Sequence, residues 1–158
     1  MSLLFNCNKV AFKFLSSVEI DNYGSNQHEL HGSRAFKDLF GFTKKYLNGT
    51  IYYIANGGSI QSFSTSLTWY DAREFANNDR SEFRFYYTHE ISAFSPQIGD
   101  ILLISQDINY NVIIVLINDS VIKSSILQNL NRFTSYEYTN GSSYSADLKN
   151  VPFLMNII

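Results

Sequence analysis

The chain has 158 residues and a formal net charge of −2; 45% of its residues are hydrophobic and only 16% are charged. This length predicts one domain, and this composition supports a packed core and excludes an intrinsically disordered chain. The single cysteine excludes an internal disulfide and the usual thiolate zinc sites. No secretion signal is visible and no apolar run is long enough to cross a bilayer, so we expect a soluble, cytoplasmic protein.

The distribution of charge along the chain is uneven. A negative net charge argues against a nucleic-acid partner. However, residues 34–84 contain seven Lys and Arg against five Asp and Glu, whereas residues 91–158 contain three against five. Such a protein can present a locally basic face, so we expect modest non-specific affinity for DNA and a specificity that depends on base contacts.

Alternation of apolar and polar residues predicts a mainly β chain. The expected strands, in chain order, are residues 10–15, 50–55, 62–70, 82–88, 100–105 and 112–117; residues 50–55 are rich in β-branched and aromatic residues, and the last two segments are expected to be core strands. Helical spacing predicts a helix over 31–40, closed by Gly41, and a second over 120–130, capped by Asp119 or Ser120. The expected fold class is therefore mainly β (α+β), an open pseudobarrel of about seven strands with two short helices capping its ends.

The last part of the chain differs in composition from the rest. It is rich in Ser, Tyr, Asn and Gly, which are residues typical of loops. We therefore expect residues 1–133 to form the pseudobarrel and residues 134–158 to form a polar linker or C-terminal tail.

The chain lacks a convincing catalytic constellation. A metal-dependent nuclease needs an Asp and a (D/E)-x-K element on strands, and the one match, Asp147 to Lys149, lies in the polar tail. His28 and His31 are one residue too close for the H-E-x-x-H zinc helix. Neither a glycine-rich phosphate loop nor a G-x-S-x-G elbow occurs. We therefore predict no catalytic residue and no metal ligand.

Two polar loops carry the side chains that suit recognition of DNA. Residues 21–29 are rich in Asn, Gln, Ser and His, and residues 70–81 mix Arg with acidic residues. Asn and Gln form hydrogen bonds with adenine edges, and Arg donates two hydrogen bonds to guanine. A carboxylate accepts a hydrogen bond from the amino group of cytosine. Acidic neighbours also hold guanidinium groups in fixed rotamers. A solvated turn with surface salt bridges is the alternative interpretation of the second loop.

Four segments together are similar to a known family. They read SVEIDNYGSNQHELHG at 17–32, LTWYDAREF at 67–75, RSEFRFYY at 80–87 and GDILLIS at 99–105. In order and approximate spacing, over more than half of the chain, this set resembles the N-terminal domain of EcoRII-type restriction endonucleases. The resemblance implies a DNA-binding pseudobarrel like that of the plant B-three transcription factors, which clamps the major groove of duplex DNA between two recognition arms.

The resemblance also implies which residues contact DNA. It places the first arm at residues 22–29 and the second at residues 70–80, with an extension to Arg84. The candidates on the first arm are Ser25, Asn26, Gln27, His28 and Glu29. The candidates on the second arm are Tyr70, Asp71, Arg73, Arg80, Ser81, Glu82 and Arg84. Among them, Glu29, Asp71 and Glu82 would read bases or orient the arginines.

In that family a nuclease domain typically follows the recognition domain, whereas this sequence ends at Ile158. The resemblance therefore implies a sequence-specific module for double-stranded DNA from a restriction system that does not cut by itself. It would be an excised domain, the partner of a separate cleavage subunit, or a chain that has lost its catalytic part. Binding would need no cofactor, and only the absent cleavage domain would need Mg²⁺.

We expect neither a membrane partner nor a small-molecule substrate. Two other functions remain open from the residues alone. The chain could be a small metal-dependent nuclease that uses Asp147 and Lys149 with a distant carboxylate. It could also be a protein-interaction β-domain whose loops bind a partner chain.

Overall fold

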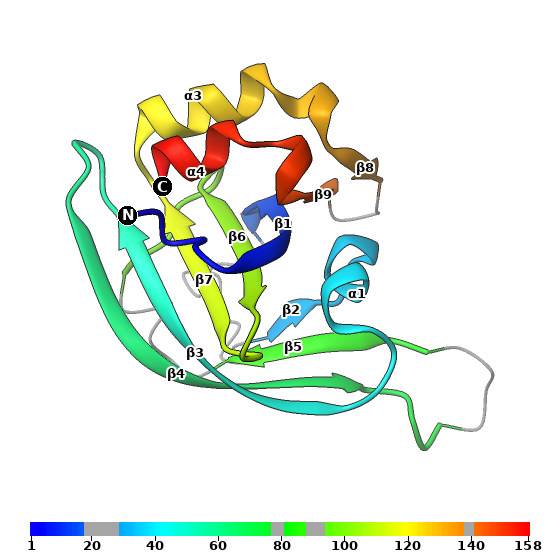
Figure 1. Ribbon diagram of the computed structural model, residues 1–158. Helices are drawn as coiled ribbons and strands as arrows, with labels where there is room; N and C mark the ends of the chain where they lie inside the picture. Colours follow the sequence, from blue (N-terminus) through cyan, green and yellow to red (C-terminus); the bar gives the residue numbers. More distant parts are fainter. Residues whose placement is uncertain (18–28, 77–80, 88–93, 138–140) are drawn as a thin grey trace.

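The computed structural model describes residues 1–17, 29–76, 81–87, 94–137 and 141–158, and only the backbone of residues 29–31 and 87. In these ranges nine strands form one sheet that curls into an open half-barrel (Figure 1). Short helices pack against the curled sheet. The expected fold class, a mainly β open pseudobarrel, is confirmed.

The described chain contains strands, α-helices and 3₁₀ helices, and the 3₁₀ helices are labelled η. They are β1 (Cys7–Phe14), β2 (Glu29–His31), α1 (Arg34–Phe40), β3 (Lys45–Ile54), β4 (Ile60–Asp71), β5 (Phe83–Tyr87), β6 (Ile101–Asp107), β7 (Val112–Ile117), α3 (Ser120–Gln128), η3 (Leu130–Arg132), β8 (Thr134–Tyr136), β9 (Ser143–Asp147), η4 (Leu148–Asn150) and α4 (Phe153–Ile157). All six expected strands are present, and β3 and β4 are longer than predicted.

The sheet consists of two antiparallel groups of strands joined by one parallel ladder. The strand order is β2-β5-β4-β3-β7-β6-β1-β9-β8. The parallel ladder joins β3 to β7, from Gly49 opposite Val112 to Ile54 opposite Ile117, and the other neighbours pair antiparallel. A side chain at Gly49 would collide with the carbonyl oxygen of Val112, so glycine permits the two backbones to approach.

Two hydrophobic cores cover the opposite faces of the sheet. In the first core, Phe36 and Phe40 of α1 pack with Trp69 of β4 and Phe85 of β5. In the second core, α3, α4 and the N-terminal segment pack against β1, β6 and β7. Because successive side chains of a strand point to opposite faces, β1 can supply Ala11 to one core and the residues on either side of it to the other.

The two predicted helices form at the expected places, although both are shorter. Gly41 ends α1 with a φ of 77°, and its N–H donates to the Lys37 carbonyl at 2.8 Å. Asp119 caps α3, because its side chain accepts from the Ile122 N–H at 2.9 Å. Within the described ranges, no helix combines the length and apolar character needed to span a membrane.

Residues 134–158, predicted to be a polar linker or tail, are instead part of the fold where the structure describes them. β9 pairs with β1, with Lys9 opposite Asp147, and the Tyr144 ring stacks on Phe12 at 4.9 Å. Buried Leu154 of α4 belongs to the second core, and the Leu3 N–H donates to the Ile158 carbonyl at 2.7 Å.

The polar residues that suggested a linker have partners in this segment. The Tyr136 hydroxyl donates to Asp38 Oδ2 of α1 at 2.8 Å, and the Ser145 hydroxyl donates to the same oxygen at 3.2 Å. Hydroxyl groups that bond to a neighbouring helix are therefore compatible with a packed strand, although their abundance in the sequence is typical of a loop.

Candidate nucleic-acid interface

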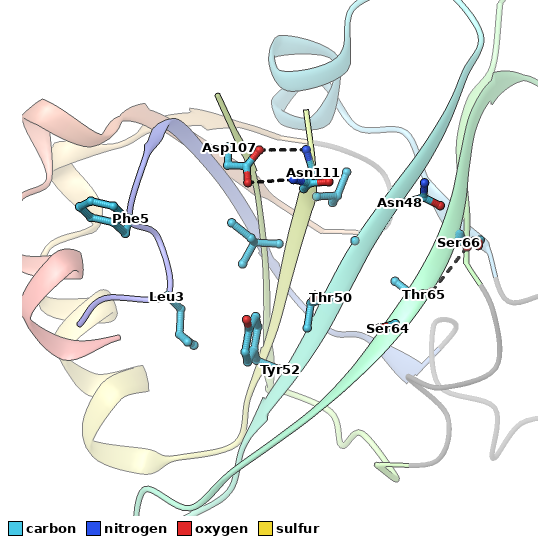
Figure 2. A pocket seen from close by; sticks show the side chains of 13 residues that line it. Leu3, Phe5, Asn48, Thr50, Tyr52, Ser64, Thr65, Ser66, Asp107 and Asn111 are labelled. Carbon is cyan, nitrogen blue, oxygen red and sulfur yellow. Dashed lines mark hydrogen bonds between the residues drawn. The ribbon is translucent and has the colours of Figure 1, made fainter. Parts of the chain in front are cut away.

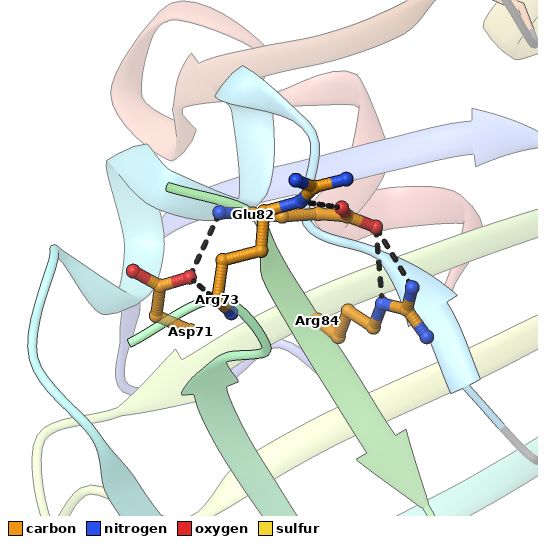
Figure 3. Close-up of polar contacts among 4 residues, drawn as sticks. All are labelled: Asp71, Arg73, Glu82 and Arg84. Carbon is orange, nitrogen blue, oxygen red and sulfur yellow. Dashed lines mark hydrogen bonds and ion pairs between the residues drawn. The ribbon is translucent and has the colours of Figure 1, made fainter. Parts of the chain in front are cut away.

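The mouth of the β4–β5 hairpin is closed by the carboxylate of Asp71 (Figure 3). Asp71 Oδ1 accepts hydrogen bonds from the backbone N–H groups of Arg73 at 2.9 Å and Glu82 at 2.8 Å. The Ala72 N–H also donates to the Glu82 carbonyl at 2.8 Å. These bonds fix the backbone on both sides of the loop, so the side chains of Arg73 and Glu82 start from defined positions.

Glu82 lies between two arginines and forms an ion pair with each (Figure 3). Its Oε2 accepts from Arg73 Nε at 2.8 Å, and its Oε1 accepts from Arg84 Nη2 at 2.8 Å and Nε at 3.2 Å. The hydrogen bond from Arg73 and, to a smaller extent, those from Arg84 lower the pKa of Glu82 from 4.5 to about 2. Glu82 is therefore ionised at neutral pH and restrains both guanidinium groups.

The Arg73 guanidinium remains accessible despite this restraint. Its side chain is 36% exposed and binds Glu82 through Nε. Its two Nη groups make no hydrogen bond to any described residue, and in Figure 3 they point away from Asp71. A guanidinium held at Nε with its Nη groups exposed can donate to two acceptors side by side.

The segment that follows the first predicted arm is bonded to the second. β2 pairs antiparallel with β5, which places Glu29 opposite Tyr86 and His31 opposite Arg84. The Gly32 N–H donates to the Phe83 carbonyl at 2.7 Å. A Cβ atom at Gly32 would lie 2.5 Å from that carbonyl oxygen, so the close approach requires glycine.

The structure accounts for only part of the predicted contact set. Ser25, Asn26, Gln27, His28 and Arg80 lie outside the described residues, and Glu29 is described by its backbone alone. On the second arm, Ser81 is exposed next to Glu82. Tyr70 is half-buried and stands opposite Arg84 in the β4–β5 register. The hairpin therefore brings together the following five predicted residues: Tyr70, Asp71, Arg73, Glu82 and Arg84.

Several residues beside the hairpin were not predicted as contacts. The strand register puts Tyr46, Thr68 and Tyr86 in one row across β3, β4 and β5, on the same face as Arg84. Tyr46 is 76% exposed and Tyr86 is 42% exposed. Lys44 Nζ lies 5.2 Å from the Tyr46 ring centroid, and this tyrosine raises the pKa of Lys44. Alternation along the longer β3 strand was the signal that could have identified Tyr46.

The opposite face of the hairpin consists of the aromatic side chains Trp69, Phe83 and Phe85. All three side chains are buried, and the Trp69 and Phe83 rings stack at 5.2 Å. Phe40 of α1 stacks on Phe85 at 5.4 Å, and Trp69 Nε1 donates to the Gly41 carbonyl at 3.0 Å. The charged residues therefore project from a ribbon whose other face is fixed in the core.

The residues of the alternative nuclease do not share one strand. Asp147 is the last residue of β9, whereas Lys149 lies in η4. Asp147 and Asp38 line a cavity of about 230 Å³, where Asp38 already accepts from the Tyr136 hydroxyl. Among the residues that the structure describes, no three His, Cys, Asp or Glu side chains form a group that could hold a metal ion.

The chemistry of the hairpin is thus that of two restrained guanidinium groups beside tyrosine and threonine hydroxyls. Guanidinium groups of this kind suit acceptor pairs such as carboxylates, phosphates and guanine edges. No protein-family model matches this sequence, and no curated protein is significantly similar to it.

Proposed function

We propose that this protein is a sequence-specific recognition module for double-stranded DNA, acting in the cytoplasm as part of a restriction system. The observation that carries the proposal is the ion-paired set Arg73, Glu82 and Arg84 at the open end of the β4–β5 hairpin. A guanidinium that is already ordered loses less side-chain entropy when it binds. This set is therefore suited to reading an acceptor pair rather than to contributing charge alone.

Recognition would use the hairpin as a two-stranded ribbon. B-form DNA admits such a ribbon into its major groove, where guanine presents N7 and O6 side by side. The exposed Nη groups of Arg73 match that pair, while Glu82 keeps Nε occupied. Lys44, on the same side of the sheet as the tyrosine row, would contact a phosphate and help to set the register.

The first arm of the clamp would be the segment that precedes β2. Ser25, Asn26, Gln27 and His28 remain predicted contacts there. The pairing of β2 with β5 supports this arrangement, because it attaches the end of the first arm to the strand that carries Arg84. The chain would bind its site without a cofactor, and cleavage with Mg²⁺ would belong to a separate domain or subunit.

The proposal is tested by selecting random duplex oligonucleotides on the protein and sequencing the bound fraction. We expect a short defined motif that contains at least one G·C pair. Arg73→Ala should then weaken binding to that motif by about 1–3 kcal/mol, or about 5- to 150-fold, and relax the preference at one position.

Arg132→Ala is the matched control, because Arg132 is an exposed arginine of η3, in a different part of the fold. It should change binding by less than about twofold, as expected of an isolated surface charge. The proposal would be refuted if selection enriched no motif, or if the two arginine variants bound the selected duplex equally well.

A further inference from the structure

A second candidate site lies on the same face of the sheet as Arg84 but closer to the N-terminal segment. There a pocket of about 630 Å³ opens between that segment and strands β3 and β4 (Figure 2). Leu3 and Phe5 stand on one side of it, and β3 and β4 form the other. The volume lies within the range of pockets that hold small molecules.

The lining offers several polar side chains from β3 and β4. Asn48 stands opposite Ser66 and Thr50 opposite Ser64 in the β3–β4 register, so their side chains lie on one face. None of these four side chains has a hydrogen-bond partner among the described residues. A ligand with several hydroxyl groups could therefore replace the water that these groups bind in the free protein.

The described lining of the pocket carries little charge. Asp107 is the one charged residue among the described residues that line it. Its Oδ1 accepts from the backbone N–H groups of Asn109 at 2.8 Å and Asn111 at 2.9 Å, and its Oδ2 accepts from Asn111 Nδ2 at 3.2 Å. The oxygens of this carboxylate already accept hydrogen bonds, and no Lys, Arg or His is among the described lining residues, so the pocket selects against phosphates and carboxylates.

Two aromatic rings complete the lining. Tyr52 is half-buried and also presents its hydroxyl to the pocket, and Phe5 is 55% exposed. Aromatic rings pack against the C–H faces of a sugar, while amide and hydroxyl groups exchange hydrogen bonds with the sugar hydroxyls.

We propose that this pocket binds a neutral sugar of one or two hexose units. Such a sugar could be free in solution or attached to a base of duplex DNA. The pocket and the hairpin share one sheet face, and Ser66 and Tyr70 are four positions apart in β4, which is about 13 Å along a strand. The DNA-linked source rests on the proposed function, whereas binding of a free sugar does not.

The first experiment titrates the ¹⁵N-labelled full chain with D-glucose, D-galactose and maltose, followed by amide chemical shifts. A hexose in this pocket should bind with a Kd in the millimolar range, as expected for a ligand of this size. Shifts should concentrate on residues 48–52 and 64–66. Ser66→Trp should abolish them by filling the pocket. Gln61→Trp, at an exposed position on the opposite face of β4, should leave the Kd within about twofold of wild type, a difference of about 0.4 kcal/mol.

The second experiment compares one duplex carrying a glucosylated base with the same duplex lacking the sugar. If the sugar is DNA-linked, wild-type protein should prefer the glucosylated duplex by about tenfold or more. Ser66→Trp should lose that preference and keep its affinity for the plain duplex. Either result supports a sugar site in this pocket if Ser66→Trp abolishes it: saturable binding of a free sugar, or a preference for the glucosylated duplex.

Two results would overturn the inference. One is the absence of saturable shifts with every sugar up to about 50 mM, well above the expected Kd, together with no preference for the glucosylated duplex. The other is that Ser66→Trp and Gln61→Trp bind the sugars, or prefer the glucosylated duplex, to the same extent. Affinity for the plain selected duplex is measured separately, so failure of the pocket and failure of the proposed function are distinguished.

Discussion

The Asp71 carboxylate accepts a 2.8 Å hydrogen bond from the backbone N–H of Glu82, eleven residues further along the chain. This bond ties the last residue of β4 to the residue that precedes β5. The carboxylate therefore acts on the backbone of the loop, while Glu82 acts on the arginine side chains. Asp71 and Glu82 therefore have different roles, and each can be removed separately.

Replacing Asp71 by Ala should loosen the hairpin mouth. Two backbone N–H groups lose their acceptor, and the net cost of a hydrogen bond to a charged group is about 1.5–3 kcal/mol. Because water reaches this loop, we expect a loss of about 1–3 kcal/mol in the free energy of unfolding, measured by urea denaturation. Asp71→Asn keeps an acceptor oxygen, so it should lose less than half of the unfolding free energy that Asp71→Ala loses. Equal stability of all three proteins would contradict this role of Asp71.

Glu82 should make stability depend on pH in the acidic range. Its pKa is lowered from 4.5 to about 2 in the folded protein by Arg73 and Arg84. A lowered folded pKa means that the ion pairs contribute fully above pH 4.5, and that this contribution is lost as the pH falls from 4.5 towards 2. Wild type should therefore lose more stability than Glu82→Gln across this interval. Parallel pH profiles for the two proteins would show that the ion pairs contribute nothing.

Gly32→Ala should weaken the attachment of β2 and α1 to β5. The added Cβ would lie 2.5 Å from the Phe83 carbonyl oxygen, so the two backbones must separate. We expect a loss of about 1–3 kcal/mol in the free energy of unfolding. The neighbouring Ser33→Ala is a stringent control, because the buried Ser33 hydroxyl has no hydrogen-bond partner in the part of the chain that the structure describes. That variant should be neutral or more stable, and a larger loss for Ser33→Ala than for Gly32→Ala would contradict the argument.

Leu154→Ala tests whether the C-terminal segment supports the fold. Leu154 is fully buried in the second core, and removal of such a side chain costs about 2–5 kcal/mol. Asn156, in the same helix, is exposed, and Asn156→Ala should change stability by less than about 0.5 kcal/mol. If the segment were a linker, thermal unfolding of the two variants would coincide.

The strands that alternate, and the apolar runs of β6 and β7, could be predicted from the sequence, whereas short or polar strands were missed. β2 has three residues, too few to show a period, and it exists because it bonds to β5. β9 reads SYSAD, and its small polar residues are typical of loops. Its position depends on pairing with β1, which lies far away in the sequence. The apolar residues Val151 and Leu154 were the available signal that the segment is packed.

The candidate site divides in the same way. Composition identified the charged cluster, because Arg73, Glu82 and Arg84 surround a loop between two alternating strands. The bridging position of Glu82 depends on the register of the hairpin, and the role of Asp71 depends on backbone geometry, which composition does not encode. The tyrosine row required the pairing of three strands, so Tyr46 and Tyr86 could not be joined to the site from one strand alone.

The parallel ladder between β3 and β7 also has a consequence for how this protein folds. It joins residues about 60 positions apart in the sequence, and both neighbouring groups of strands depend on it for their relative position. The β3–β4 hairpin can form from local contacts, but the ladder must wait until β7 arrives. Contacts between residues far apart in the sequence slow folding, so the β3–β7 ladder should form late in the transition to the native state.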